Sequence, residues 1–276
     1  MFSEIINNNL SVNKVKMNAD YILRDKKGKT VPYPLPKQSG FLIQISGYSG
    51  SGKTTLLMNL LSKKNKNGIR QSYRKLFDDI IFVSPSAHTI KNNPLDTLEE
   101  TKKFETFSDE VLDKVDEIVE KNLEDDDKPK HTLLILDDVG VSLRRNRPLE
   151  NRLNTLAANR RHKFLSIIYI TQIFNMSPVQ LRKNLNLLII FRPKTRKETE
   201  SLIDDYFMMP KQDVLKLFDF TFRDKHDFMI IDFTMRTSAN IEYFRNYNKI
   251  EISKPNINEE NKTNAKKENE KTKTND

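Results

Sequence analysis

The stretch FLIQISGYSGSGKTTLLMNLL (residues 41–61) decides the fold, because three patterns follow one another within it. An apolar run comes first, a glycine-rich turn ending in Lys-Thr-Thr follows, and apolar residues at helical spacing end the stretch. The eight residues GYSGSGKT (47–54) match the P-loop pattern G-x-x-x-x-G-K-[ST], placed between a strand and a helix. We therefore expect this chain to bind a nucleoside triphosphate.

Each part of the loop has an expected role. Glycines let the backbone turn tightly, so that successive N–H groups point at phosphate oxygens, and the following helix N-terminus favours the anion. Lys53 is expected to reach the β- and γ-phosphates, and Thr54 to offer its hydroxyl to Mg²⁺. The predicted nucleotide-binding residues are Gly47, Tyr48, Ser49, Gly50, Ser51, Gly52, Lys53, Thr54 and Thr55.

Beyond this stretch, apolar runs of strand length alternate with segments of helical length. The runs are nearly continuous, as expected for strands covered on both faces of a parallel sheet. The predicted strands are FLIQIS (41–46), IIFVS (80–84), LLILD (133–137), SIIYIT (166–171) and LLIIF (187–191). The predicted helices are 54–63, 108–122, 148–159, 177–184 and 197–207. This alternation predicts an α/β fold with a doubly wound, mainly parallel sheet and helices on both faces.

Three regions are expected along the chain. Residues 1–39, with the proline-rich VPYPLPKQ (31–38), are expected to form an extended N-terminal arm, and residues 40–252 the P-loop domain. Within that domain PKQDVLKLF (210–218) predicts a further helix, and FMIIDFTM (228–235) an added edge strand. Residues 253–276 contain almost no apolar residue and are expected to be a disordered charged tail.

Composition limits the function classes. The chain contains no cysteine, which excludes disulfides, thiol catalysis and Cys-ligated zinc, and its four histidines are scattered. No signal peptide or membrane span is recognisable, so we expect a soluble intracellular protein without a membrane partner. The formal charge of +9 favours a polyanion such as nucleic acid, although charges spread evenly over a solvated surface remain the alternative.

A second motif, HTLLILDDVG (131–140), has the Walker B pattern. Four apolar residues run into Asp137, which would hold Mg²⁺ at the carboxyl end of a strand. Asp138 follows directly, where a carboxylate can polarise a water for attack on the γ-phosphate. The alternative is that Asp138 only caps the next turn.

The stretch NRRHKFLSIIYITQ (159–172) carries three further candidates. Gln172 ends the strand after Walker B, where a polar side chain can sense the γ-phosphate, unless it is an ordinary strand-end residue. Arg160 and Arg161 precede the same strand, and in a ring an arginine there can enter the neighbour's site as a finger. A solvated basic turn is the alternative, and the sequence does not choose between the two arginines.

The set GYSGSGKTTLL, LLILDDVG, NRRHKFLSIIYITQ and QLRKNLNLLIIFRP resembles the poxvirus-type genome-packaging ATPases of large DNA viruses, in the FtsK–HerA branch of P-loop motors. The resemblance covers roughly residues 40–235. It implies a RecA-like ATPase domain, a homo-oligomeric ring, and hydrolysis of ATP with Mg²⁺ to drive double-stranded DNA into a preformed capsid. Capsid or portal proteins are then possible partners, and the host-cell cytoplasm or the virion is the expected location.

The resemblance also implies roles for individual residues. Lys53 and Thr54 become the nucleotide and Mg²⁺ contacts, Asp137 the Walker B carboxylate, Asp138 the base and Gln172 the sensor. Arg160 or Arg161 becomes the finger. Many relatives have a glycine before the Arg-His turn, where this chain has Asn159 and a second arginine, so the register of the finger stays open.

Several alternatives remain open. A guanine-reading N/T-K-x-D motif and an LSGGQ-like signature are absent from the sequence, which argues against a GTP switch and an ABC ATPase. A nucleotide or nucleoside kinase with RRNR (144–147) as its lid, a non-catalytic ATP-binding scaffold, and a helicase or cellular DNA pump remain.

Two basic segments are candidates for gripping DNA phosphates. The loop VSLRRNRP (141–148) carries Arg144, Arg145 and Arg147, and KKNKNGIRQSYRK (63–75) is the second segment. In both cases a solvated basic loop is the alternative. The aromatic residues of EYFRNYNK (242–249), Tyr243, Phe244 and Tyr247, are interpreted as packing residues.

Overall fold

The structure is a computed structural model, and it describes residues 21–62, 73–90, 93–124, 129–144, 146–234 and 241–252. Several predictions lie outside these residues. They concern the start of the predicted arm (1–20), most of the second basic segment (63–72), Arg145 and the charged tail (253–276).

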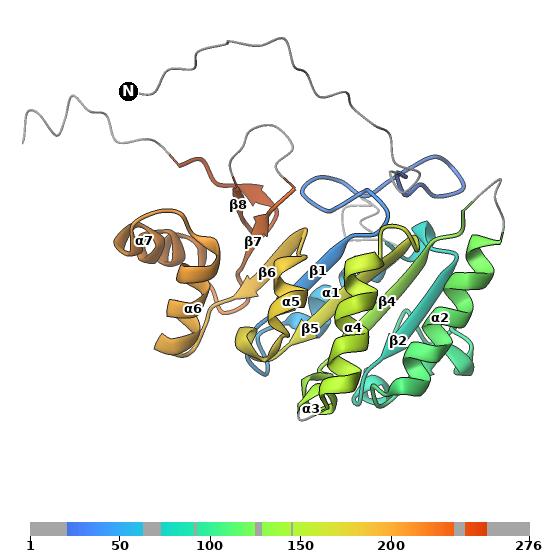
Figure 1. Cartoon of the computed structure of the whole chain (residues 1–276). Coiled ribbons are helices and arrows are strands. Elements are labelled where there is room, and N and C mark those ends of the chain that lie inside the picture. Colours follow the sequence, from blue (N-terminus) through green and yellow to red (C-terminus); the bar gives the residue numbers. More distant parts are fainter. Residues whose placement is uncertain are drawn as a thin grey trace, which may run out of the picture.

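In the described residues, strands form a single nine-stranded sheet in the order β3-β2-β4-β5-β1-β6-β7-β8-β9 (Figure 1). The strands from β3 to β6 in this order are parallel, and β7, β8 and β9 are added antiparallel. The sheet is therefore mainly parallel, as the sequence predicts. Its strands are β1 (Leu42–Ser46), β2 (Asp79–Val83), β3 (Lys103–Phe104), β4 (Thr132–Asp137), β5 (Leu165–Thr171), β6 (Leu187–Phe191), β7 (Phe228–Asp232), β8 (Glu242–Arg245) and β9 (Asn248–Lys249).

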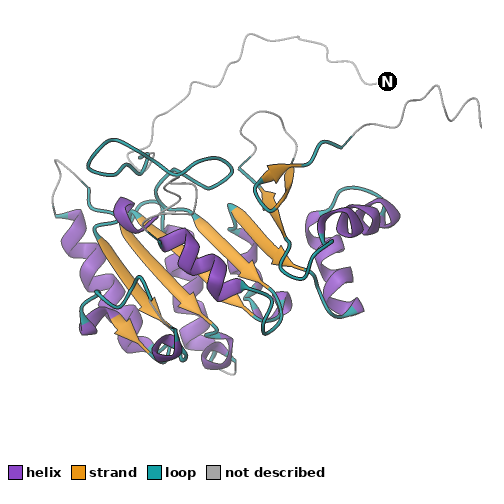
Figure 2. Ribbon diagram, turned by 180° about the vertical axis from the view of Figure 1, so that it is seen from behind, coloured by secondary structure: helices purple, strands orange, loops and turns teal. Residues whose placement is uncertain are grey.

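Helices cover both faces of the sheet, which confirms the predicted doubly wound arrangement. One face packs against α2, α4, α5, α6 and α7, and the other against α1 and η1 (Figures 1 and 2). The α-helices are α1 (Lys53–Leu61), α2 (Asp109–Leu123), α3 (Gly140–Leu143), α4 (Arg147–Asn159), α5 (Val179–Lys183), α6 (Arg196–Tyr206) and α7 (Lys211–Thr221). Short 3-10 helices are η1 (Tyr73–Leu76), η2 (Ala87–Thr89), η3 (Glu100–Lys102) and η4 (Phe174–Met176).

Local sequence explains how the main helices form. In α2 the buried residues Val111, Val115 and Val119 recur every four positions, which gives the helix one apolar stripe. At the start of α4, the side-chain oxygen of Asn146 accepts a hydrogen bond from the Leu149 N–H at 3.2 Å. This cap ends the preceding turn and sets where α4 begins.

Residues 21–39 pack against the same face as α1. Leu23, Val31 and Leu35 are buried in the cluster that includes the α1 leucines, and the Tyr73 hydroxyl donates to the Pro36 carbonyl at 2.9 Å. Figure 1 shows these loops at the end of the sheet opposite α3. The described part of the predicted arm thus contributes apolar side chains to the core.

The prediction of an edge strand at 228–235 is wrong. Strand β7 lies inside the sheet, because β8 pairs with it on the side away from β6. Tyr243 and Phe244, in β8, are 6% and 1% exposed, which confirms their interpretation as packing residues. Tyr247, between β8 and β9, is partly buried and packs against the same cluster as Phe244.

No helix in the described part of the chain has both the length and the apolar character that crossing a membrane requires. The sheet order has a direct consequence for function. Strands β4, β5 and β1 are adjacent and parallel, so their carboxyl ends meet at one edge. The loops that follow these three strands are therefore neighbours, which is where α/β sheets bind their ligands.

Candidate nucleotide site

The phosphate loop joins β1 to α1, and its glycines shape it. Gly50 and Gly52 have φ values of 78° and 115°, in the left-handed region that L side chains rarely adopt. A Cβ on Gly47 would lie 2.7 Å from Phe191 Cβ and 2.8 Å from Ser51 Oγ. The absence of a side chain at Gly47 therefore lets the loop lie directly on the end of β6.

Lys53 begins α1 and turns back over the loop. Its Nζ donates to the carbonyl oxygens of Gly47 at 2.6 Å and Tyr48 at 3.0 Å. Burial lowers the pKa of Lys53, and the nearby carboxylates of Asp137 and Asp138 act in the opposite direction. The structure thus brings the Walker A lysine and the Walker B carboxylates into one site.

Asp137 is the last residue of β4 and is only 5% exposed. Ser84 directly follows β2, and its hydroxyl donates to Asp137 Oδ2 at 3.0 Å. Burial raises the pKa of Asp137, against the Ser84 hydrogen bond, while the charge of Asp138 raises it further and that of Lys53 lowers it. A nearby cation would favour the ionised form of this carboxylate.

Asp138 and Gln172 contact each other directly. Asp138 has a left-handed φ of 55°, and its N–H donates to the Ile170 carbonyl of β5 at 3.1 Å. The Gln172 Nε2 donates to Asp138 Oδ2 at 2.5 Å. Because β5 lies between β4 and β1, Gln172 is located between the two Walker strands. Left-handed backbone at a non-glycine residue is uncommon and concentrates at functional sites.

The other predicted loop residues surround these groups. Ser51 is fully buried, whereas Ser49 and Gly50 are exposed. Thr54 is partly buried in the first turn of α1, and the exposed Thr55 accepts a hydrogen bond at its carbonyl from the Asn59 side chain. The middle of the phosphate loop, at Ser49 and Gly50, is therefore exposed to solvent, whereas Ser51 is buried.

The two arginines before β5 lie at the opposite end of the strands and differ in environment. Arg160 is 5% exposed. Its guanidinium donates to the carbonyls of Ala157 at 2.6 Å and Asn184 at 2.8 Å, and to Asn186 Oδ1 at 3.1 Å. Burial lowers the pKa of Arg160 to about 10, and the charge of Arg161 adds to that shift. Arg161 is exposed.

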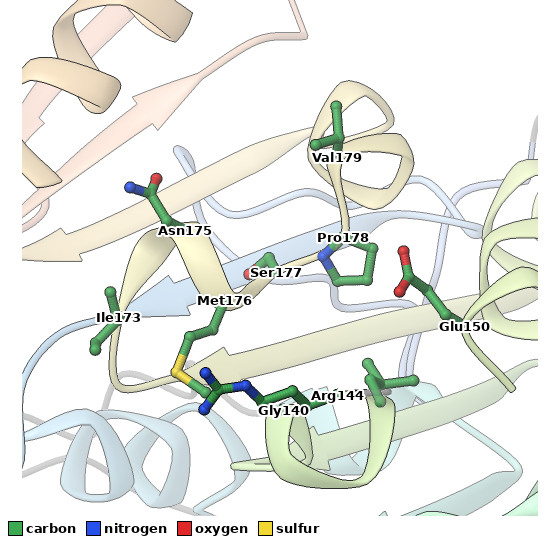
Figure 3. A pocket seen from close by; sticks show the side chains of 10 residues that line it. Gly140, Arg144, Glu150, Ile173, Asn175, Met176, Ser177, Pro178 and Val179 are labelled. Atoms are coloured by element: carbon green, nitrogen blue, oxygen red, sulfur yellow. The ribbon is translucent and has the colours of Figure 1, made fainter. Parts of the chain in front are cut away.

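The basic loop after Walker B borders a pocket of about 540 Å³. Figure 3 shows the side chains of Arg144, Glu150 and Met176 around this pocket. Arg144 and Arg147 are both exposed. The pocket lies between the segments that follow β4 and β5, so Arg144 is located beside the loops that carry Asp138 and Gln172.

Two residues that no sequence pattern singled out contact the phosphate loop. Lys194, after β6, has its Nζ 4.1 Å from the centroid of the Tyr48 ring. His226, before β7, has its Nδ1 2.9 Å from the Ser51 carbonyl oxygen. An antiparallel strand starts where its neighbour ends, so both loops reach the same edge of the sheet. The antiparallel pairing of β6 with β7 would have located both residues, but this pairing cannot be read from the sequence alone.

Comparison with known proteins supports the predicted family. A family model described as "Poxvirus A32 protein" matches residues 35–266. No curated protein sequence matches the chain significantly.

Solved structures with a similar fold include the following two. The genome packaging NTPase B204 from Sulfolobus turreted icosahedral virus 2, in complex with AMPPCP, is 14% identical with a TM-score of 0.50, over 76% of this chain and 98% of that chain. The pCW3 conjugation coupling protein TcpA, in its monomer form with ATPγS, is 12% identical with a TM-score of 0.51. The match covers 84% of this chain and 71% of that chain. At these identities the similarity concerns the fold, and it confirms the predicted P-loop α/β architecture.

Proposed function

This chain belongs to the Poxvirus A32 protein family, and from this membership we propose that it is an ATPase that drives double-stranded DNA into viral capsids. The observation that carries the proposal is the contact between Asp138 and Gln172 beside the Walker A lysine, at one edge of the sheet. The similar fold of B204, a genome packaging NTPase that binds AMPPCP, supports the same class.

The phosphate loop would bind the triphosphate through its N–H groups, with Lys53 leaving its carbonyl partners to contact the β- and γ-phosphates. Hydroxyl and carboxylate oxygens are the ligands that Mg²⁺ prefers, so the Thr54 hydroxyl and the buried Asp137 carboxylate fit this ion. When bound, Mg²⁺ would neutralise developing charge on the phosphates. Mg²⁺ commonly takes few protein ligands and completes its shell with water and phosphate.

Asp138 is the proposed base. It would accept a proton from a water as the water oxygen attacks the γ-phosphorus and the bond to the β–γ bridging oxygen breaks, giving ADP and phosphate. Its hydrogen bond from Gln172 fixes the direction of the carboxylate. Because Gln172 follows β5, loss of the γ-phosphate would be transmitted through this hydrogen bond to β5, which lies between β4 and β1.

For the arginine finger, the contacts of Arg160 favour Arg161. The Arg160 guanidinium is buried and bonded to carbonyl and amide oxygens of its own chain, so it would have to break those bonds to reach a neighbour. Arg161 is exposed at the end of the sheet away from its own phosphate loop. We therefore assign the finger to Arg161, acting on an adjacent subunit of a homo-oligomeric ring.

The motor requires a sequence-independent grip on DNA, which the phosphate backbone offers to basic side chains. Arg144, beside the site, and Arg147 are both exposed, and with Arg145 they form the proposed DNA-contacting loop. Capsid or portal proteins are proposed docking partners, and the viral assembly site in the host cytoplasm, or the virion, is the proposed location.

The proposal can be tested by measuring ATP hydrolysis with and without linear double-stranded DNA, beside Lys53→Ala. We expect duplex DNA to stimulate hydrolysis and the substitution to abolish it, because Lys53 is the charge that reaches the transferred phosphate. Hydrolysis indifferent to DNA, with transfer to a small acceptor, would instead identify a kinase. Nucleotide binding without hydrolysis would identify a scaffold.

A further inference from the structure

The phosphate loop is held from outside by a histidine far along the chain. The Nδ1 of His226 lies 2.9 Å from the carbonyl oxygen of Ser51. A carbonyl oxygen can only accept a hydrogen bond, so Nδ1 must carry the proton and donate it. In neutral His226 the proton therefore resides on Nδ1, and Nε2 has the free lone pair.

This hydrogen bond fixes the orientation of one peptide group. A phosphate loop works when its N–H groups point inward, which turns carbonyls outward, where each buried one needs a donor. Ser51 is fully buried, and His226 supplies that donor to its carbonyl. A Cβ on Gly52 would lie 3.4 Å from Phe191 Cε1 and 3.5 Å from His226 Nδ1. The Ser51–Gly52 peptide is therefore enclosed by two side chains.

The turn that presents His226 is itself well anchored. Asp227 is 6% exposed, and its Oδ2 accepts from the backbone N–H groups of Arg223 at 3.1 Å and Asp224 at 2.9 Å. The Arg245 guanidinium donates to the same oxygen at 2.8 Å, and the Asn246 amide donates to Oδ1 at 3.0 Å. These contacts connect the turn to the end of β8 and limit how far it can move.

These hydrogen bonds and the burial of Asp227 have opposite effects on its pKa. Burial alone would raise it, but the hydrogen bonds from Asn246, the Asp224 backbone and Arg245 outweigh burial and lower the pKa to about 2. The carboxylate is thus ionised, and its hydrogen bonds are formed, at neutral pH.

We propose that His226 is a positioning residue for nucleotide binding: its Nδ1–H holds the Ser51 carbonyl outward, so that the Gly52 N–H faces the phosphates. The proposal rests on the proposed ATP site and adds a fourth segment to it. His226 acts through the loop and has no assigned contact with the reacting atoms.

Two substitutions separate the donor from the shape of the side chain. In His226→Asn the Nδ2 can take the place of Nδ1, because both atoms are attached to Cγ, and the donor is kept. In His226→Leu a methyl group takes that place and the donor is lost. His162→Leu is the matched control, because His162 is exposed at the opposite end of the strands. Thermal unfolding of each variant shows whether it is folded.

The measurement is the Kd for ATPγS with Mg²⁺, followed by KM and kcat for ATP. One lost hydrogen bond corresponds to about a three- to tenfold weaker Kd for His226→Leu. We expect the loss to fall on KM more than on kcat, His226→Asn to recover most of the affinity, and His162→Leu to keep the wild-type Kd for ATPγS. Unchanged affinity in His226→Leu, or equal losses in the Leu and Asn variants, would overturn the proposal.

A second measurement needs no substitution. Long-range ¹⁵N–¹H spectra of the imidazole report which nitrogen carries the proton, and we expect protonated Nδ1 in neutral His226. Protonation on Nε2 alone would overturn the proposal even if the Leu variant failed to fold. Failure of the proposed ATPase function can be distinguished from failure of the His226 proposal, because a chain that binds ATPγS without hydrolysing ATP still shows the Kd difference between the variants.

Discussion

At the scale of single residues, Asp138 combines a left-handed backbone with a carboxylate that accepts from Gln172. Asp138→Asn separates these properties, because asparagine also adopts the left-handed region and its side-chain oxygen still accepts a hydrogen bond. Asparagine cannot accept the proton from water. We expect ATPγS affinity close to that of the wild type and hydrolysis slower by roughly 10²- to 10⁴-fold.

The comparison variant is Asp138→Ala, which removes the acceptor and also places alanine in a strained conformation at a cost of about 1 kcal/mol. Steady-state hydrolysis and thermal unfolding measure the two effects. If Asp138→Asn hydrolysed ATP at the wild-type rate, Asp138 would be a turn cap and the assignment of the base would be incorrect.

The sequence located the site residues that belong to motifs, and it missed those that do not. Asp137 ends an apolar run, Gln172 follows one, and Lys53 ends the glycine-rich loop that follows another, so their position at one edge of the sheet follows from the strand pattern. His226 lies in a turn without a pattern of its own. Its partner Ser51 is 175 positions earlier in the sequence, and a contact between segments so distant in sequence leaves no local signal.

At the scale of elements, Arg160 and Arg161 are predicted to separate stability from activity. Arg160 connects the end of α4 to the segment before β6, so Arg160→Ala removes the guanidinium donor from the buried Ala157 carbonyl and the partly buried Asn184 carbonyl. We expect a loss of about 2–4 kcal/mol in the free energy of unfolding. Arg161→Ala is expected to lose less stability than Arg160→Ala, because Arg161 is exposed, and to hydrolyse ATP about 10³-fold more slowly in the assembled ring.

Urea unfolding and hydrolysis assays on both variants check this prediction. A mixture of Lys53→Ala and Arg161→Ala subunits is the control, because an arginine acting on a neighbour should restore activity at some interfaces. Activity lost in Arg160→Ala without loss of stability, or unchanged in Arg161→Ala, would contradict the assignment.

Strands were predictable to the extent that they are long and buried on both faces. Five predicted strands correspond to β1, β2, β4, β5 and β6, because continuous apolar runs are required there. The two-residue strands β3 and β9 are too short to show a period. Strand β8 consists of two adjacent aromatic residues between two charged ones, so it has neither a continuous apolar run nor an alternating pattern, and without it β7 was assigned to the edge.

At the scale of the whole molecule, the charge of +9 is expected to act through one loop rather than through the entire surface. Replacing Arg144, Arg145 and Arg147 with glutamine should reduce the slope of log K for DNA against log salt by up to about 3, since each phosphate contact contributes about 0.9. Fluorescence anisotropy with duplex DNA at several salt concentrations measures that slope.

The matched control replaces Lys26, Lys27 and Lys29 with glutamine, because these exposed residues lie in the loops at the opposite end of the sheet. The charge change is the same, so a general surface effect would lower both slopes equally. Equal slopes for the two triple variants would show that the loop after Walker B has no special contact with DNA.

The position of β1 in the sheet has a consequence for the order in which the protein is made. β1 pairs with β5 and β6, so Leu42 aligns with Ile167 and Ile43 with Leu187, and the loop that β1 carries is bonded by His226. During translation, the strand and its glycine-rich loop leave the ribosome long before any of these partners exist. Contacts so distant in sequence form slowly. The nascent chain therefore carries an unpaired apolar strand until most of the domain has been synthesised, and its ability to bind ATP arises only near the end of folding.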